Sequence, residues 1–297
     1  MSDLLLVNAH SRRTNARKTA AIAARIAAAG RRAEVRETRS VDEAQTIVRE
    51  AVAEGLERLW VAGGDGAVNS VVPILAGSDT ALAVIPLGTG NVLARELRIP
   101  IRWQRAVDAL ICGETRVTDL GEANGRLFVL FIGFGFDAEV ARRVGGRLKA
   151  WIGRTEFFRA AVCASLTYSP FEIEIATDET VIRHRAWMAL LTNTPTYAGV
   201  LNLAPQADPT DGILDIWVAT AEPPGPRSRP AFIAQGLDRL LLKRPMPGEC
   251  LYRCRSARVT CRPEVWMQAD GEPFGRGEVE VRVRPSALRL VVPRTVR

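Results

Sequence analysis

Two strand-like segments of this chain each end in a glycine turn that opens into a helical pattern, and this repeat constrains the fold more than any other feature. The first unit spans residues 59–75 and carries GGDG at 63–66, with a helix expected over 67–75. The second unit spans residues 81–97 and carries PLGTGN at 86–91. Two such units in succession predict a parallel sheet with both turns at one carboxyl edge, where ligands of open α/β sheets bind.

A glycine turn after a strand can expose backbone N–H groups to a phosphate. Glycine allows positive φ and a close approach to a ligand, and the N-terminus of the next helix adds unsatisfied N–H groups and a positive dipole end. Asp65 would repel a phosphate unless a cation lay between them, so the turn favours a magnesium-bound nucleotide. Neither GxxxxGK[ST] nor GxGxxG occurs in the chain, which excludes a P-loop and a classical dinucleotide turn.

Alternation of strands and helices is confined to the first part of the chain. Strands are expected at 4–7 and 33–37, and helices at 14–29 and 41–54. Together with the two glycine-turn units, this pattern predicts a doubly wound α/β nucleotide-binding domain over residues 1–121.

The remainder of the chain is rich in β-type segments with few helices between them. Residues 122–285 are therefore predicted to form a largely antiparallel, β-sandwich-like domain, and a final strand near 286–297 could return to the first domain. Helices are expected near Arg147–Leu166 and Pro230–Leu242. The expected strands are Phe171–Ala176, Val181–Leu191, Ile213–Ala219, Leu251–Cys261, Val265–Ala269, Val279–Val283 and Leu288–Val292.

Composition limits the partners and the compartment. The 297 residues are 47% hydrophobic and carry a net charge of +7, which suits a nucleotide or an anionic membrane surface. No zinc-finger, RNP or basic-helix pattern occurs, so nucleic acid is not an expected partner. The five cysteines include no CxxC pair and are interpreted as reduced thiols. Without a signal peptide or an apolar run of about 18 residues, the protein is expected in the cytoplasm.

A series of short motifs extends in a fixed order along nearly the whole chain. The motif residues are Asn8, Thr38, the GGDG turn, Pro86, Gly88, Thr89, Asn91, Arg95, Asp119, Leu120, Gly121, Gly133, Phe134, Gly135, Phe136, Asp137, Ala204, Pro205, Asp208, Asp211, Gly212, Leu214, Asp215, Asp270, Gly271 and Glu272. As a set they resemble the diacylglycerol kinase catalytic family, which includes bacterial lipid kinases, sphingosine kinases and ceramide kinases. The resemblance implies ATP bound in a cleft between an α/β domain and a β-sandwich, and phosphoryl transfer to a lipid hydroxyl.

The resemblance also implies roles for individual residues. Asp270 or Glu272 would accept the proton of the lipid hydroxyl, and Asp65 is a third candidate for that role. Asp137 would lie nearest the lipid head group. The nucleotide would contact Asn8, Thr38, Gly63, Gly64, Asp65, Gly66, Ala67, Val68, Asn69, Ser70, Gly88, Thr89 and Asn91.

Three carboxylates, Asp208, Asp211 and Asp215, lie in a turn that enters an expected strand. Poorly solvated carboxylates this close would repel one another, so they either face water or share a cation. The resemblance implies a structural magnesium held by Asp208, Asp211 and the carbonyl of Ile213. A solvated turn is the alternative.

Other motif residues also have purely structural interpretations. Asp270 and Gly271 form a common hairpin turn pair, and Asp137 could cap a helix. Residues 145–166 mix aromatic and basic side chains, Trp151 and Phe158 among them, and could form either a core helix or a helix at a membrane interface.

The chain departs from the family pattern at Ala67 and Ser70 in the glycine loop, at Val92, and at Ala9. We interpret it as a cytoplasmic, peripherally membrane-associated, ATP-dependent lipid kinase of phospholipid metabolism, acting on diacylglycerol or a related lipid. A soluble small-molecule kinase of the NAD kinase type and a non-catalytic nucleotide or lipid sensor are the alternatives. A homo-oligomer is compatible with any of them.

Overall fold

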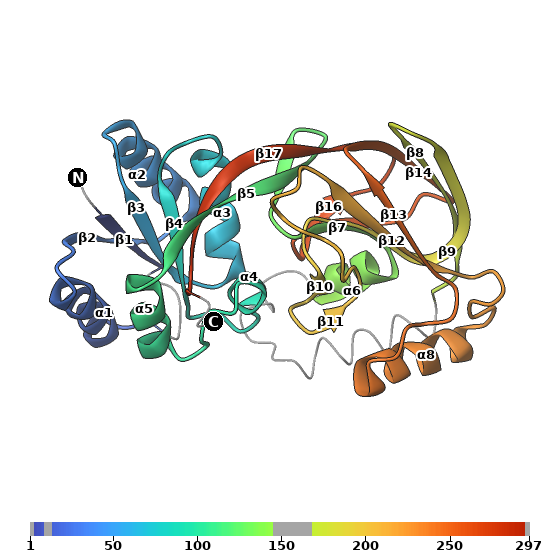
Figure 1. Ribbon diagram of the computed structural model, residues 1–297, viewed down its shortest axis with the longest axis horizontal. Coiled ribbons are helices and arrows are strands. Elements are labelled where there is room, and N and C mark those ends of the chain that lie inside the picture. Colours follow the sequence, from blue (N-terminus) through green and yellow to red (C-terminus); the bar gives the residue numbers. More distant parts are fainter. Residues whose placement is uncertain (1–2, 9–13, 145–167, 295–297) are drawn as a thin grey trace. The chain divides into compact units, whose positions relative to one another are not determined.

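The computed structural model describes residues 3–8, 14–144 and 168–294 and divides the chain into two compact units (Figure 1). Unit 1 comprises Met1–Asp119 and Pro285–Arg297, and unit 2 comprises Leu120–Arg284. Each unit contains its own set of buried apolar residues. The expected helix near 147–166, with Trp151 and Phe158, lies outside the described residues, as does Ala9.

Unit 1 alternates strands with helices. Its elements are β1 (Asp3–Asn8), α1 (Ala16–Ala28), β2 (Ala33–Thr38), α2 (Val41–Ala53), β3 (Arg58–Gly63), α3 (Asp65–Leu75), β4 (Ala81–Pro86), α4 (Val92–Glu96), α5 (Trp103–Ile111), most of β5 (Glu114–Ala123) and the second part of β17 (Val279–Val292). The strands β17, β4, β3, β1 and β2 lie in that order, and each neighbouring pair is parallel.

The strand order places the helices of unit 1 on both faces of the sheet. The connection from β1 to β2 runs one way across the sheet, whereas those from β2 to β3 and from β3 to β4 run the other way. Because such connections are right-handed, α1 lies on one face and α2 and α3 on the opposite face. Accordingly, α2 packs beside α3 and α1 beside α5. The predicted doubly wound α/β architecture is confirmed.

Side-chain caps define where the first helices begin. The Asn15 side chain accepts the Lys18 amide at 2.8 Å before α1, and Ser40 accepts the Glu43 amide at 3.1 Å before α2. Each cap satisfies one of the N–H groups that the first turn of a helix leaves unpaired. Ile22 and Ile26, four residues apart on α1, are then buried on one face.

A buried polar anchor ties the first strand of unit 1 to its neighbours. Asp3 on β1 is 1% exposed, and its carboxylate accepts the Trp60 indole N–H at 2.7 Å. The Arg31 guanidinium donates to both carboxylate oxygens of Asp3, each at 2.7 Å. Trp60 is fully buried on β3, so one carboxylate joins two strands and the loop before a third.

Unit 2 is largely antiparallel. Its elements are β6 (Arg126–Phe128), β7 (Phe131–Gly135), α6 (Phe136–Val144), β8 (Phe171–Thr177), β9 (Val181–Thr192), β10 (Thr196–Tyr197), β11 (Leu201–Asn202), β12 (Leu214–Thr220), α8 (Arg229–Leu242), β13 (Glu249–Cys254), β14 (Ser256–Arg262), β15 (Met267–Ala269), β16 (Glu272–Gly275) and the first part of β17. The strands β16, β15, β7, β9, β8, β14 and β17 lie in that order, and β12 lies between β9 and β13.

The long strand β9 changes partners along its length. Residues 181–186 pair with β8, while residues 188–192 lie between β7 and β12. The strands on both sides of this change contribute to one apolar core, in which Phe134, Phe171 and Leu191 are buried. This arrangement confirms the predicted β-sandwich-like second domain.

Several predicted boundaries of elements are wrong. The helix expected to begin at Ala67 begins at Asp65, so the acid of the glycine turn lies in its first turn. The single strand expected over Leu251–Cys261 is two strands, β13 and β14, that separate at Arg255. Conversely, the two strands expected at 279–283 and 288–292 are one continuous strand, β17. Helices α5 and α6 and strands β5 to β7 were not predicted.

Among the described residues, no helix combines the length and the apolar character needed to cross a bilayer.

The Asp3 anchor generates a stability prediction. Asp3→Ala leaves the Trp60 N–H and the Arg31 guanidinium without their acceptor, so the unfolding free energy should fall by on the order of 3 kcal/mol. The control is Asp79→Ala, because Asp79 is 97% exposed in its 2.9 Å pair with Arg289. Exposed pairs contribute little, so this change should have a much smaller effect. Urea denaturation of both purified variants tests this; equal loss in the two would contradict the role of Asp3.

Candidate active site

The two glycine turns of unit 1 lie side by side because the strands before them pair in parallel. Gly63 at the end of β3 lies opposite Pro86 at the end of β4, and the Leu87 amide donates to the Gly63 carbonyl at 2.8 Å. Asn8 and Thr38 end β1 and β2 opposite each other in the same sheet. All four strand ends therefore lie at one carboxyl edge, where the sequence predicted nucleotide contacts.

Close backbone approach, rather than unusual dihedral angles, explains the glycines of these turns. None of Gly63, Gly64, Gly66, Gly88 and Gly90 has a positive φ, so the expected positive φ is wrong, whereas their close approach to a ligand stays a prediction. A Cβ on Gly88 would lie 2.5 Å from the Gly64 Cα, and one on Gly64 would lie 3.0 Å from the Gly88 Cα. Two turns can approach this closely only if neither carries a side chain.

The Asp65 carboxylate joins the two turns. Its Oδ1 accepts the amide of Val92 at 2.7 Å and that of Leu93 at 3.3 Å, so it caps the N-terminus of α4. Burial raises the pKa of Asp65, and the N–H groups of Leu93 and Val92 oppose this by lowering it. A Cβ on Gly90 would lie 2.9 Å from Oδ2, so the loop before α4 also closes tightly around this carboxylate.

Asn91 shapes the second turn. It adopts a left-handed conformation with φ of 49°, and its side chain both accepts the Gly88 amide and donates to the Gly88 carbonyl, each at 2.8 Å. The Arg95 guanidinium donates to the Gly90 carbonyl at 3.1 Å. Thr89 is exposed between these contacts. The amide side chain thus holds the turn in shape, while Thr89 at its tip is accessible.

The remaining predicted nucleotide residues differ in what they can offer a ligand. Ala67, Val68, Asn69 and Ser70 occupy the first turns of α3. Val68 is 1% exposed and packs into the core, so only its backbone could face a ligand. The Ser70 hydroxyl donates to the Ala67 carbonyl at 2.8 Å, and the buried Thr38 hydroxyl donates to the Val7 carbonyl at 3.4 Å. The backbone N–H groups at the N-terminus of α3 are thus the main donors that these residues could offer a nucleotide.

In unit 2, Asp270 lies in a two-residue hairpin turn between β15 and β16, in which Asp270 and Gly271 both have positive φ. The hairpin interpretation is therefore correct, but the carboxylate does more than turn the chain. It accepts the amides of Val129, Leu130 and Phe131 at 2.6, 2.9 and 3.1 Å. These three amides hold the Asp270 carboxylate against the backbone of residues 129–131.

Glu272, the other candidate for proton acceptor, is held differently. Its carboxylate accepts the Arg126 guanidinium at 2.8 Å in a half-exposed ion pair, and Arg126 also donates to the Pro273 carbonyl at 3.1 Å. A carboxylate in such a surface pair is accessible, and one of its oxygens is engaged by Arg126.

Asp137 lies in the first turn of α6 and is connected to the Asp270 turn through Gln268. The Gln268 side chain donates to Asp137 Oδ2 at 2.7 Å and accepts the Gly271 amide at 2.6 Å. Both Asp137 and Gln268 are buried, and a Cβ on Gly133 would overlap the Asp137 carboxyl group. Two residues predicted to contact the substrate side of the reaction are thus brought together by a residue that the sequence did not indicate.

Burial raises the pKa of Asp137 to about 7, and the hydrogen bond from Gln268 opposes this by lowering it. Asp137 Oδ1 is buried and has no hydrogen-bond partner among the described residues. Such an atom is a candidate contact for a ligand hydroxyl or amine, because an unpaired buried acceptor costs free energy.

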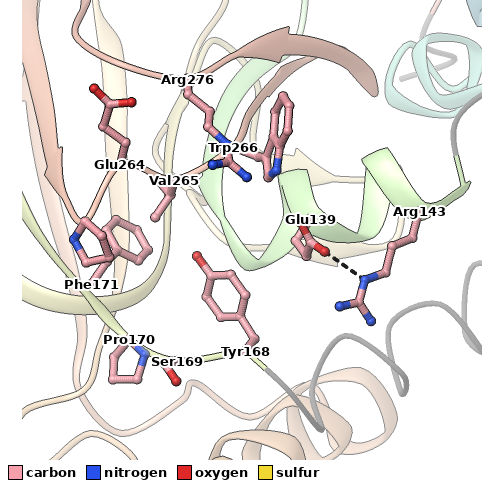
Figure 2. Close-up of a pocket in the computed structure, with 11 residues that line it drawn as sticks. Glu139, Arg143, Tyr168, Ser169, Pro170, Phe171, Glu264, Val265, Trp266 and Arg276 are labelled. Carbon is pink, nitrogen blue, oxygen red and sulfur yellow. Dashed lines mark hydrogen bonds and ion pairs between the residues drawn. The ribbon is translucent and has the colours of Figure 1, made fainter.

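A pocket of about 310 Å³ lies beside α6 in unit 2 (Figure 2). Tyr168 and Trp266 line it, and the Arg276 guanidinium lies over the Trp266 ring at 4.2 Å. Glu139 and Arg143 on α6 form a 2.8 Å ion pair at its rim. Burial, followed by the charge of Asp137, raises the pKa of Tyr168. The lining combines aromatic and charged groups, which suits a ligand that is both apolar and polar.

The acidic turn before β12 contacts the guanidinium of Arg253, which the sequence did not indicate. Asp211 Oδ1 accepts the Ile213 amide at 3.0 Å, and Oδ2 forms an ion pair with Arg253. Arg253 also lies 3.6 Å from the buried Asp215. Asp208 accepts the amide and hydroxyl of Thr210 at 3.0 and 2.7 Å. Both carboxylate oxygens of Asp211 are thus already engaged, and magnesium binding by Asp208, Asp211 and Ile213 stays a prediction.

The predicted residues thus form separate groups within the units. Unit 1 brings together the residues of the two glycine turns, and unit 2 brings together Asp137 and Asp270 through Gln268. The expectation that both units contribute to one active site stays a prediction. Gln268 could have been noticed as a polar residue between the apolar Met267 and Ala269, just before the Asp-Gly pair, but its two hydrogen bonds depend on the packing of β15 against β7 and α6.

The raised pKa of Asp137 generates a pH-dependent prediction. From about pH 4 to pH 7 the unfolded carboxyl group loses its proton while the folded one retains it, so the wild type loses stability as the pH rises. Asp137→Asn removes this penalty and should stabilise the protein relative to wild type near pH 8 but not near pH 4. The expected gain is about 1.4 kcal/mol per unit of pKa difference.

Urea midpoints measured across this pH range test the expectation. Asp79→Asn, which removes one exposed carboxylate, controls for the change in net charge. A pH-independent effect of Asp137→Asn would show that burial does not penalise the charged form.

Both domains of the chain are similar to those of known lipid kinases. The family description for a diacylglycerol kinase catalytic domain matches residues 3–123, and that for a YegS C-terminal NAD kinase beta sandwich-like domain matches residues 131–292. A diacylglycerol kinase of Mycobacterium tuberculosis is 31% identical over 263 residues, which cover 85% of this chain and 82% of that protein.

Further similarities extend over most of the chain. A relative in Pseudomonas fluorescens, named as a YegS-like lipid kinase, is 30% identical over 273 residues, which cover 90% of this chain and 87% of the relative. The solved structure of a diacylglycerol kinase from Bacillus anthracis str. Sterne has the same fold, with a TM-score of 0.77 at 19% identity over 100% of this chain and 98% of that one. The chain therefore belongs to the diacylglycerol kinase family of lipid kinases.

Proposed function

We propose that this protein transfers the γ-phosphoryl group of ATP to a hydroxyl group of diacylglycerol or a related lipid. Unit 1 would bind the nucleotide and unit 2 would bind the lipid. The observation that carries the proposal is the close approach of Gly64 and Gly88, which leaves a side-chain-free edge at the N-terminus of α3. Backbone N–H groups at such a helix end are suited to phosphate.

Phosphoryl transfer needs charge neutralisation, alignment of the reacting groups and an acceptor for the hydroxyl proton. The backbone of residues 63–66 and 88–90 would bind and align the phosphates. Asp270, whose carboxylate is fixed by three amides, would accept the proton, and Asp137 would orient the lipid head group. Magnesium prefers oxygen ligands, and the Asp65 carboxylate could supply one. Magnesium, when bound, would neutralise phosphate charge.

Asp65 is the first residue to test. Asp65→Asn keeps an oxygen that can accept the Val92 amide, so α4 remains capped, but it removes the negative charge. The rate of phosphoryl transfer should fall by at least about 100-fold while the fold persists. The matched control is Asp42→Asn, because Asp42 is also an acid in the first turn of a helix.

The measurement is a radiolabelled-ATP assay of the purified full chain with separate acceptors: diacylglycerol, a sphingoid base, phosphatidylglycerol and NAD. Label in a lipid that is lost only in Asp65→Asn supports the proposal. Label in NAD instead would identify a small-molecule kinase. Nucleotide binding without label in any acceptor would identify a sensor, an outcome that the Ala67 and Ser70 departures would then explain.

A second comparison separates the two candidate proton acceptors of unit 2. Asp270→Asn should lower kcat by about 100- to 10,000-fold, in the range of general-base catalysis. Glu272→Gln should change kcat only a few-fold, because the Glu272 carboxylate is half-exposed and engaged by Arg126, whereas that of Asp270 is held in place by three amides. Near-ultraviolet circular dichroism checks that the loop held by Asp270 remains folded. A large loss in Glu272→Gln and a small one in Asp270→Asn would reverse the assignment.

A further inference from the structure

Helix α8 of unit 2 presents apolar side chains to solvent. Leu237, Leu240, Leu241 and Leu242 are 37%, 39%, 73% and 58% exposed. Residues 237, 240 and 241 are spaced to lie on one face of a helix. A surface helix usually buries such a face against the core, so exposed leucines at this spacing require an explanation.

The opposite side of α8 is firmly attached to unit 2. Phe232 stacks on Trp187 with ring centroids 4.8 Å apart, and it contacts the edge of Phe136 at 5.2 Å. The buried Arg239 donates to the Asn202 carbonyl at 2.5 Å and lies 3.6 Å from the Glu249 carboxylate. The leucines cannot turn inward without breaking these contacts, because rotation would expose the aromatic ring and the buried guanidinium.

We propose that α8 is a membrane-docking surface, whose leucines enter the interfacial region of a bilayer that contains anionic lipid. Basic residues flank the helix: exposed Lys243 and Arg244 follow Leu242 directly, and exposed Arg227 precedes the helix. A helix with exposed leucines and adjoining basic residues is suited to the boundary between acyl chains and anionic head groups. This inference deepens the proposed function and rests on it, since a lipid kinase must reach a substrate held in a bilayer.

Two observations favour a bilayer over a second copy of the chain: α8 packs against the element that carries Asp137, and its flanks are basic. Phe136, against which α8 packs, directly precedes Asp137 in the sequence and on α6. A bilayer at the exposed leucines would lie across α8 from Phe136, one helix away from the element that carries the proposed head-group residue. A second copy docked by the same face would bring two cationic flanks together, which like-charge repulsion opposes.

The test is the binding of the full chain to vesicles of phosphatidylcholine with and without phosphatidylglycerol. The double variant Leu241→Gln with Leu242→Gln should bind the anionic vesicles at least about tenfold more weakly, because it removes the two most exposed leucines of the helix. The pair Lys243→Gln with Arg244→Gln should weaken binding to anionic vesicles only. The matched control is Val41→Gln with Val181→Gln, which changes valines that are 56% and 47% exposed elsewhere.

Unchanged vesicle binding of the leucine variant, with the same melting temperature as wild type, would overturn the proposal. A wild-type dimer on size-exclusion chromatography that becomes a monomer in the leucine variant would assign the face to a second copy instead, and would also overturn it. Wild-type activity on detergent-dispersed diacylglycerol is measured separately. Failure of that assay contradicts the kinase proposal, whereas loss of vesicle binding in the leucine variant still supports the docking surface.

Discussion

The contact between the Gly64 and Gly88 backbones is the constraint on which the rest of unit 1 depends. Parallel pairing of β3 and β4 brings the two turns to the same sheet edge, and the absence of both side chains lets them close on each other. Only then can Asp65 at the start of α3 accept amides at the start of α4. One steric requirement thus aligns two helix N-termini at the edge where a phosphate is proposed to bind.

In unit 2, carboxyl groups are held next to an apolar, β-rich core. Asp270 is satisfied by three backbone amides, whereas Asp137 is buried with one oxygen unpaired and with a pKa raised to about 7. Gln268 connects them with one donor and one acceptor. A buried polar network of this kind specifies the relative positions of its members, because each broken bond leaves a desolvated group unpaired.

Family membership rests on both units, whereas lipid selectivity is expected to rest on unit 2. Family membership is shown by matches to both domain descriptions and by a diacylglycerol kinase that is 31% identical over most of its length. The chemistry that distinguishes one lipid from another is expected in unit 2, where Asp137 and the pocket beside α6 combine polar and aromatic groups. Helix α8, attached to this region through the contact of Phe232 with Phe136, carries the proposed bilayer contact on its opposite side.

Sequence by itself determined the two domain types and the importance of the glycine turns, because periodicity and glycine position are local properties of the chain. The expected positive φ of those glycines was wrong, and the close approach of Gly64 and Gly88 could not be foreseen because the two turns are more than twenty positions apart. Gln268 and Arg253 could not be predicted for the same reason: their partners Asp137 and Asp211 lie far from them in the sequence. Only the tertiary structure decided which buried side-chain oxygens have no hydrogen-bond partner. Burial and hydrogen bonding depend on which residues packing brings together, and sequence order does not determine this.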